Sequence, residues 1–134
     1  GLAKEVAPVT VDGVRADMLA SDVAALMKTK PSPSVQLLPL FDPYLMGHES
    51  RDHLFERIHR PKVSRTAGWI SAVVLADGRV VGTWTHATRK ETLRVTVAPF
   101  ARLPSKIRSE IELRAGSIAE ALGLSDAKVE QVRL

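Results

Sequence analysis

Cysteine is absent from this sequence of 134 residues. Its absence excludes disulfides, thiol nucleophiles and zinc sites built on thiolates, so any chemistry would use oxygen, nitrogen or imidazole groups. No apolar run approaches the ~20 residues of a membrane-spanning helix, and the N-terminus lacks the pattern of a signal peptide. We therefore expect a cytoplasmic protein that does not contact a membrane.

Aromatic residues make up only 4% of the chain, and its eight glycines are scattered. Scattered glycines exclude a glycine-rich phosphate loop. With so few aromatic rings, Phe41, Tyr44, Trp69 and Trp84 are expected to lie in the core and not to stack on bases. Hydrophobic residues account for 45% of the chain, enough for a single-domain core.

No motif for metal binding or catalysis is found. His48 and His53 are five residues apart and His53 and His59 six, so neither pair shares one face of a helix. Ser50 and Asp52 lie near His53 only in sequence, and Ser50 is better explained as a helix cap. We expect no metal, no small-molecule cofactor and no catalytic residue in this chain.

Positive charge is the more informative property. Nineteen Lys and Arg against 15 Asp and Glu give a net charge of +4, the sign expected of a phosphate-binding protein. Most of this excess lies between Arg51 and Arg65, where five cationic and two acidic side chains give +3. Two interpretations stay open: a solvated helix face followed by a basic loop, or a surface that contacts phosphates. The cationic residues of this window are Arg51, Arg57, Arg60, Lys62 and Arg65.

The N-terminal region, residues 1–30, is predicted to form a β-hairpin and a short helix. The chain begins Gly-Leu-Ala-Lys-Glu without an initiator Met, so we expect a piece of a longer protein. Apolar and polar residues alternate from Val6 to Leu19 around Asp12-Gly13, a sequence typical of tight hairpin turns. Ser21 is then predicted to cap the short helix.

Residues 31–134 are predicted to form a second region, after the proline-containing linker Lys30–Ser34. An apolar strand is expected to bend or end near Pro39, and a helix is predicted near 51–60, terminated by Pro61. A longer helix is predicted near 105–122, because its apolar residues recur at helical spacing.

A second hairpin is predicted at Asp77-Gly78, where its two-residue turn would pair Ala76 with Arg79 and Val73 with Gly82. A third strand, Thr92–Ala98, would place Leu93, Val95 and Val97 inward. The intervening residues 86–91 would form a polar hairpin tip, and a closing strand is expected from Ala127 to Leu134, with Val129 and Val132 inward. This tip would expose His86, Arg89 and Lys90.

Between Leu37 and Trp84 the sequence contains a Leu-Leu-Pro-x-Phe-Asp-x-Tyr-Leu run (Leu37–Leu45), Arg51, His59-Arg60, Gly68-Trp69 and Asp77–Trp84. At these positions it resembles a family of winged-helix DNA-binding proteins that includes bacterial alkylpurine and crosslink-unhooking DNA glycosylases. The resemblance implies an α+β fold: an antiparallel β-barrel-like sheet with a long helix towards the C-terminus. Residues 1–30 would then be the wing hairpin and trailing helix of a truncated winged-helix unit.

The same resemblance implies double-stranded DNA as the partner and at most a nucleoid association for a cytoplasmic protein. Family glycosylases orient the attacking water with a Gln-apolar-Asp or Gln-apolar-Gln motif, which neither Gln36 nor Gln131 begins. We therefore expect a non-catalytic DNA-binding or scaffold part, with the parent's own activity left open. The alternative is a structural or protein-interaction domain without DNA contacts. The predicted DNA-binding residues are Arg51, Arg57, Arg60, Lys62, Arg65, His86, Arg89 and Lys90.

Overall fold

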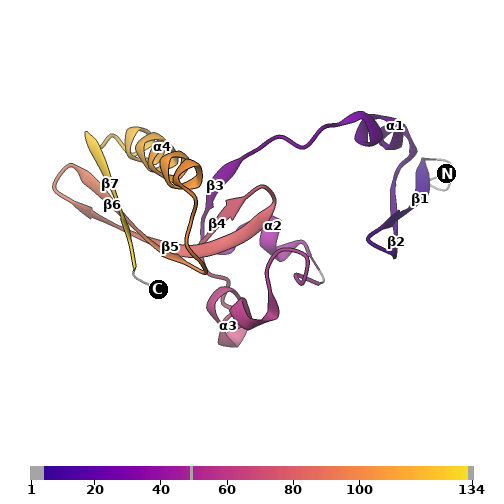
Figure 1. The fold of residues 1–134 in the computed structure, drawn as a ribbon, viewed down its shortest axis with the longest axis horizontal. Coiled ribbons are helices and arrows are strands. Elements are labelled where there is room, and N and C mark those ends of the chain that lie inside the picture. The colour runs from indigo at the N-terminus through magenta and orange to yellow at the C-terminus, as the bar shows by residue number, and fades with distance from the viewer. Residues whose placement is uncertain (1–4, 49, 133–134) are drawn as a thin grey trace. The chain divides into compact units, whose positions relative to one another are not determined.

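The computed structural model describes residues 5–48 and 50–132. It divides into two compact units, Gly1–Ser32 and Pro33–Leu134, each with its own β-sheet (Figure 1). The division lies two residues beyond the predicted end of the N-terminal region. Helices and strands occur in both units, so the fold is of the α+β type, and no described helix has the length and apolar character to span a membrane.

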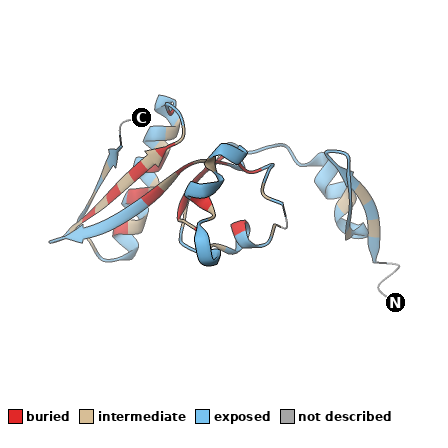
Figure 2. Cartoon of the chain, turned by 90° about the horizontal axis from the view of Figure 1, so that it is seen from below, coloured by how far each residue is buried: buried red, intermediate tan, exposed pale blue. Residues whose placement is uncertain are grey.

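The first unit is a hairpin followed directly by a helix. β1 (Val6–Val11) pairs with β2 (Val14–Leu19) around the predicted turn, in which Asp12 and Gly13 have positive φ. α1 (Ala20–Lys28) follows β2 directly, and its N-cap position is Leu19, two residues before the predicted cap Ser21. The prediction that Ser21 caps it is wrong, because its hydroxyl lies inside the helix and donates to Asp22 at 2.9 Å. None of residues 5–32 is buried (Figure 2).

The second unit contains a five-stranded sheet in the order β3-β4-β5-β6-β7. The first four strands are antiparallel neighbours, whereas β7 runs parallel to β6. The predicted wholly antiparallel, barrel-like arrangement is therefore wrong in one pairing, and over the described residues the sheet stays open, with β3 and β7 at its edges. The strands are β3 (Val35–Leu38), β4 (Val73–Ala76), β5 (Arg79–Arg89), β6 (Thr92–Pro99) and β7 (Asp126–Gln131).

The parallel pairing follows from the long helix that separates the last two strands. α4 (Ser105–Ala121) occupies the predicted range and carries the chain across the sheet, as a parallel crossover requires. Its buried residues Ile111 and Ala115 belong to the same core cluster as the inward side chains of β6 (Figure 2). Those inward residues are the predicted ones: Leu93, Val95 and Val97.

The hairpin of β4 and β5 contains an irregularity that the two-residue turn does not predict. Ala76 pairs with Arg79 as expected, but the register shifts between Val74 and Leu75. Val74, and not Val73, is therefore opposite Gly82. A Cβ at Gly82 would lie 2.7 Å from the Ala98 carbonyl oxygen, so this close approach of β5 and β6 requires glycine.

Residues 39–71 cover the other face of the sheet with short helices and turns. The predicted helix near 51–60 is wrong: Glu56 is extended, and a 3₁₀ turn, η2 (Arg57–His59), follows it. Pro61 starts a helix and does not end one, because it lies in the first turn of α3 (Arg60–Val63), where its missing N–H is not needed. The second core cluster consists of Leu45, Leu54, Phe55, Val63, Ile70, Val73, Leu75 and Val80.

The aromatic residues divide between core and surface. Trp84 is buried as predicted, and its indole N–H donates to the Leu38 carbonyl oxygen at 2.8 Å. The other three were predicted to lie in the core but are exposed: Phe41 by 41%, Tyr44 by 41% and Trp69 by 43%. The rings of Phe41 and Trp69 pack edge to face, and the helix α2 (Pro43–Met46) carries Tyr44 outward.

The last strand also differs from its prediction. It begins at Asp126 and ends at Gln131. Val129 is partly buried against the core as predicted, but Val132 is 51% exposed because the strand has ended before it. The remaining predicted strand residues, 133 and 134, lie outside the described residues.

Candidate nucleic-acid interface

Arg51, the first residue of the basic window, contributes to the fold. Its Nε donates to the Leu45 carbonyl oxygen at 2.6 Å, and the residue is half-buried. Leu45 is fully buried in the second core cluster. The guanidinium therefore donates to a carbonyl oxygen that the short helix α2 leaves without a hydrogen-bond donor.

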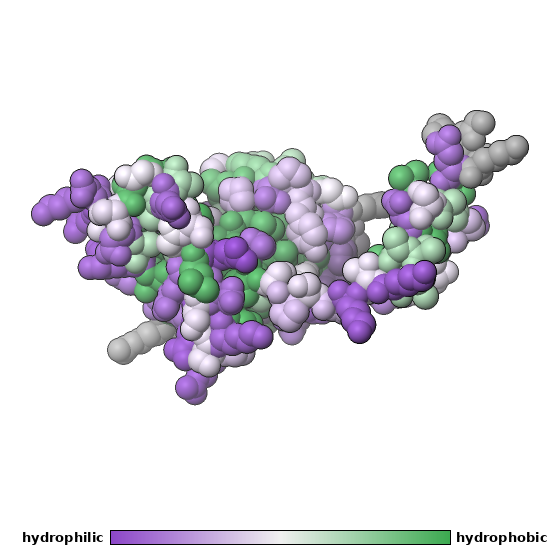
Figure 3. Space-filling model, turned by 90° about the horizontal axis from the view of Figure 1, so that it is seen from above, coloured by the Kyte–Doolittle hydropathy of each residue, from purple (hydrophilic) through white to green (hydrophobic). Residues whose placement is uncertain are grey.

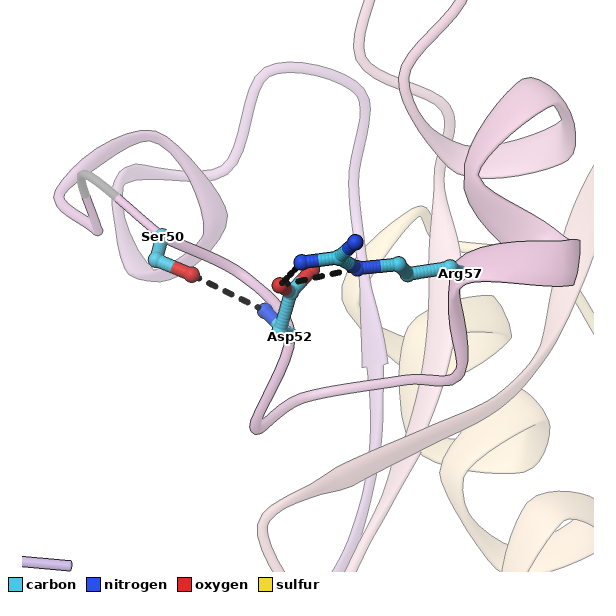
Figure 4. A network of polar contacts seen from close by, with 3 residues as sticks. All are labelled: Ser50, Asp52 and Arg57. Atoms are coloured by element: carbon cyan, nitrogen blue, oxygen red, sulfur yellow. Dashed lines mark hydrogen bonds and ion pairs between the residues drawn. The ribbon is translucent and has the colours of Figure 1, made fainter.

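Arg57 binds the carboxylate of Asp52 in a polar cluster on the same surface (Figure 4). Its Nη2 and Nε lie 2.8 and 3.2 Å from Asp52 Oδ2, and the Asp52 backbone N–H donates to Ser50 Oγ at 3.4 Å. The hydrogen bond from Arg57 holds the pKa of Asp52 below its usual value, and the same bond raises the pKa of Arg57. Ser50 thus organises a turn and does not cap a helix.

Lys62 and His59 lie against Phe100. The imidazole of His59 stacks on the Phe100 ring with centroids 4.0 Å apart and planes 9° apart. Lys62 Nζ is 5.7 Å from the same ring centroid, within the range of a cation–π contact. These two members of the basic window are therefore directed towards an aromatic side chain of their own unit.

Arg65 lies on a small hairpin that the sequence did not predict. Ser64 forms a bridge with Ile70, and the Arg65 backbone N–H donates to the Trp69 carbonyl oxygen at 2.8 Å. The turn passes through Ala67 and Gly68, both with positive φ. Arg65 shares a shallow surface concavity, the loop concavity, with Arg57 and Arg60. Its lining residues are Arg57, Arg60, Pro61, Ser64, Arg65 and Thr66.

The hairpin of β5 and β6 carries the other predicted residues. It is longer than expected: β5 continues to Arg89, which pairs with Thr92, so only Lys90 and Glu91 form the turn. Lys90 has φ of +51°, a conformation that costs a non-glycine residue free energy. Every residue from 85 to 91 is exposed.

His86 is separated from its predicted partners by the sheet itself. It pairs with Val95, whose side chain is buried on the side of α4, and its ring lies 5.5 Å from that of Trp84. Because side chains alternate between faces, Arg89 lies on the opposite face, which we call the outer face. The structure therefore brings Arg89 together with Lys90 but not with His86.

Two further cations that the sequence did not single out complete the outer face. Arg94 of β6 and Lys128 of β7 occupy opposite positions in the parallel pair. Together with the hairpin they form a second shallow depression, the outer-face concavity, at the end of the unit where hydrophilic side chains gather in Figure 3. Alternation along each strand predicts that Arg94 and Lys128 point outward, but only the pairing of β6 with β7 brings them next to each other. The lining residues are Arg89, Lys90, Thr92, Arg94 and Lys128.

Metal-binding groups are not assembled in the described part of the chain. No group of three or more His, Cys, Asp or Glu residues lies close enough together there to hold a metal ion. The rings of His48 and His53 do approach to 4.7 Å, edge to face, although their spacing argued against a shared helix face. Their contact forms part of a short aromatic row with Tyr44.

Comparison with known proteins gives consistent matches over nearly the whole chain. Residues 1–121 match the family model described as "DNA glycosylase AlkZ-like". The chain is 39% identical over 132 residues to an interstrand DNA cross-link repair glycosylase of Streptomyces sahachiroi. It also matches the solved structure of the Streptomyces sahachiroi DNA glycosylase AlkZ with a TM-score of 0.83 and 37% identity, over 98% of this chain. In both cases it spans 34% of the relative's length.

Proposed function

Because the chain belongs to the AlkZ-like DNA glycosylase family, we propose that it is a DNA-contacting, non-catalytic part of a DNA repair glycosylase. The observation that carries this proposal is the outer-face concavity, which four cationic side chains and Thr92 line. A cationic depression on a member of this family suits the phosphates of double-stranded DNA. No cofactor is needed for this role.

The shape of the β5–β6 hairpin supports the same function. Two-stranded ribbons fit into DNA grooves, and residues 85–91 form an exposed ribbon end with Lys90 in its turn and Arg89 next to the turn. The strained conformation of Lys90 also supports a functional role. Glycine would avoid the strain, and non-glycine residues with positive φ are frequent at functional sites.

We also propose which part of the family's fold each of the two units represents. A hairpin followed by a helix, as in β1, β2 and α1, has the composition of the wing and trailing helix of a winged-helix unit. That none of residues 5–32 is buried supports this assignment, since such elements need further helices to form a core. In the second unit, the five-stranded sheet with α4 on one face would correspond to the family's β-barrel region.

The alternative, a structural domain without DNA contacts, is favoured by one observation in the basic window. Three of its five cations are directed towards groups of the protein itself. Arg51 binds a backbone carbonyl, Arg57 binds Asp52, and Lys62 lies over Phe100.

Titration of fluorescent duplex DNA with the full 134-residue chain, followed by anisotropy, tests the proposal. We expect binding whose affinity falls linearly on logarithmic axes as salt rises. Neutralising Arg60, Lys62, Arg89 and Lys90 together should weaken it. A chain that is folded by circular dichroism but shows no binding at low salt would support the structural alternative.

The absence of catalysis is tested separately. Incubated with duplex DNA that carries alkylated purines, the chain should bind without releasing bases. Base release in proportion to the concentration of the purified chain would contradict the non-catalytic assignment.

A further inference from the structure

Arg94 and Lys128 lie side by side on the outer face of the sheet. Leu93 and Val95 are buried on the other face, and Val129 packs there too, so the alternating residues of β6 and β7 project outward. Neighbouring strands lie about 4.8 Å apart. The register Arg94↔Lys128 therefore holds two positive charges next to each other.

This arrangement is unfavourable unless an anion balances it, because like charges on adjacent strands destabilise a sheet. Glu130 supplies part of the balance, since its Oε1 lies 3.1 Å from Arg94 Nη2, and Asp126 lies on the same face of β7 two residues before Lys128. Lys128 makes no ion pair with any other described residue. Of the residues that the structure describes, none with a carboxylate lines the outer-face concavity itself, while Thr92 adds a hydroxyl to it.

We propose that Arg94 and Lys128, together with Arg89 and Thr92, bind neighbouring phosphate groups of the DNA backbone on this outer face. Glu130 holds Arg94 in the free protein and gives it up to the phosphate on binding. This proposal depends on the DNA-binding function proposed above and adds a specific site to it. Neither Arg94 nor Lys128 is on the hairpin turn, so the site extends the interface from the turn onto the sheet.

The exposure of the Arg94–Glu130 pair makes such an exchange feasible. The side chain of Arg94 is 43% exposed and that of Glu130 is 59% exposed. Ion pairs at this exposure contribute little stability, so breaking one costs little. A guanidinium binds phosphate through two parallel hydrogen bonds, stronger than the single contact made to Glu130. Glu130 should therefore reduce DNA affinity by competing for Arg94.

The variant Glu130→Gln tests this competition, with Glu112→Gln on the exposed surface of α4 as the matched control. Both variants change the net charge equally, but only the first releases Arg94. We expect Glu130→Gln to raise duplex affinity about two- to five-fold, the range that corresponds to one exposed ion pair. The control should change affinity by less than that. Equal increases in both variants would overturn the proposal in favour of a net-charge effect.

A double-mutant cycle locates the effect at Arg94. In the Arg94→Gln background, Glu130→Gln should no longer raise affinity, and Lys128→Gln should lower the salt dependence by about one phosphate contact. The side-chain Nε–H resonance of Arg94 should also shift when DNA is added. The proposed site would be overturned by an unshifted resonance. It would also be overturned if Glu130→Gln still raised DNA affinity in the Arg94→Gln background.

The outcomes distinguish this site from the broader function. If the wild-type chain binds no DNA, the proposed function fails and the site fails with it. If DNA binding persists and depends on Arg89 and Lys90 but not on Arg94, Lys128 or Glu130, only the outer-face phosphate site is wrong.

Discussion

The basic window 51–65 and the outer face of the sheet carry similar charge but use it differently. In the window, Arg51 and Arg57 make hydrogen bonds to the protein, and Lys62 lies over an aromatic ring. On the outer face, Arg89, Lys90 and Lys128 make no side-chain hydrogen bond or ion pair with the rest of the described chain. Cations in the first region mainly stabilise structure, whereas those in the second are available to a ligand.

The contrast arises from local geometry. Turns and single helical turns bring side chains close to backbone carbonyls that lack donors, and arginine satisfies them. Strands place alternate side chains away from the backbone and in line with those of neighbouring strands. A dense cationic run in sequence therefore does not by itself leave its side chains free of contacts within the protein, whereas cations from separate strands can share one exposed face.

Removing three charges from each region is the strongest test of this difference. We expect Arg89→Gln/Lys90→Gln/Lys128→Gln to reduce the salt slope of duplex binding by about 2.7, from three lost phosphate contacts. The matched triple variant Arg57→Gln/Arg60→Gln/Arg65→Gln removes the same charge from the loop concavity and should reduce it by about one. The salt slopes are measured by anisotropy from low to moderate salt. If both triple variants gave the same slope, the two regions would not differ in their contribution to DNA binding.

Arg51 should affect stability and not binding. The variant Arg51→Leu leaves the Leu45 carbonyl without its donor, so we expect a loss of about 1–3 kcal/mol in the free energy of unfolding. Urea denaturation measures this loss, and Arg57→Gln, which removes an exposed cation, serves as the control. A weaker DNA affinity with unchanged stability would instead assign Arg51 to the interface.

Lys90 should show the opposite behaviour. The variant Lys90→Gly relieves the strain of its positive φ and should stabilise the fold by about 1 kcal/mol while weakening DNA binding. Lys90→Gln removes the charge but keeps the strain, so it should weaken binding without a gain in stability. If Lys90→Gly bound DNA as tightly as the wild-type chain, the charge at the turn would have no role in binding.

The smallest effect is expected from the exposed Asp52–Arg57 pair. Since folding lowers the pKa of Asp52, the pair stabilises the fold above the usual carboxyl pKa. That contribution is lost as the pH falls through the lowered value. Asp52→Asn should therefore flatten the acid side of the stability profile between about pH 5 and pH 2. Glu56→Gln is the control, and an identical flattening there would show that the pair has no specific role.

Local turn chemistry accounts for most of what the sequence predicted. The Asp12-Gly13 and Asp77-Gly78 turns formed as expected because positive φ at both positions is set within two residues. The alternation of β6 and the helical spacing of α4 also predicted their buried residues. Each of these signals is contained in one short segment.

The failures depend on contacts between distant segments. The helix predicted near 51–60 is replaced by turns that direct both Leu54 and Phe55 into the second core cluster. The register shift at Val74 depends on neighbouring strands, and the parallel pairing of β7 depends on α4. Arg89 and Lys90 are neighbours in sequence and were predicted together as site residues. Lys128 was not predicted, because it joins them only through the pairing of distant strands.

The parallel pairing of β7 determines when the outer-face concavity can form. Lys128 reaches Arg94 only after α4 has crossed the sheet and the last strand has docked. During synthesis, the hairpin of β5 and β6 can form well before the residues of β7 have been added. A complete concavity would thus mark a finished unit, and a chain ending before Asp126 would lose Lys128 and leave an edge of β6 open to unwanted strand pairing.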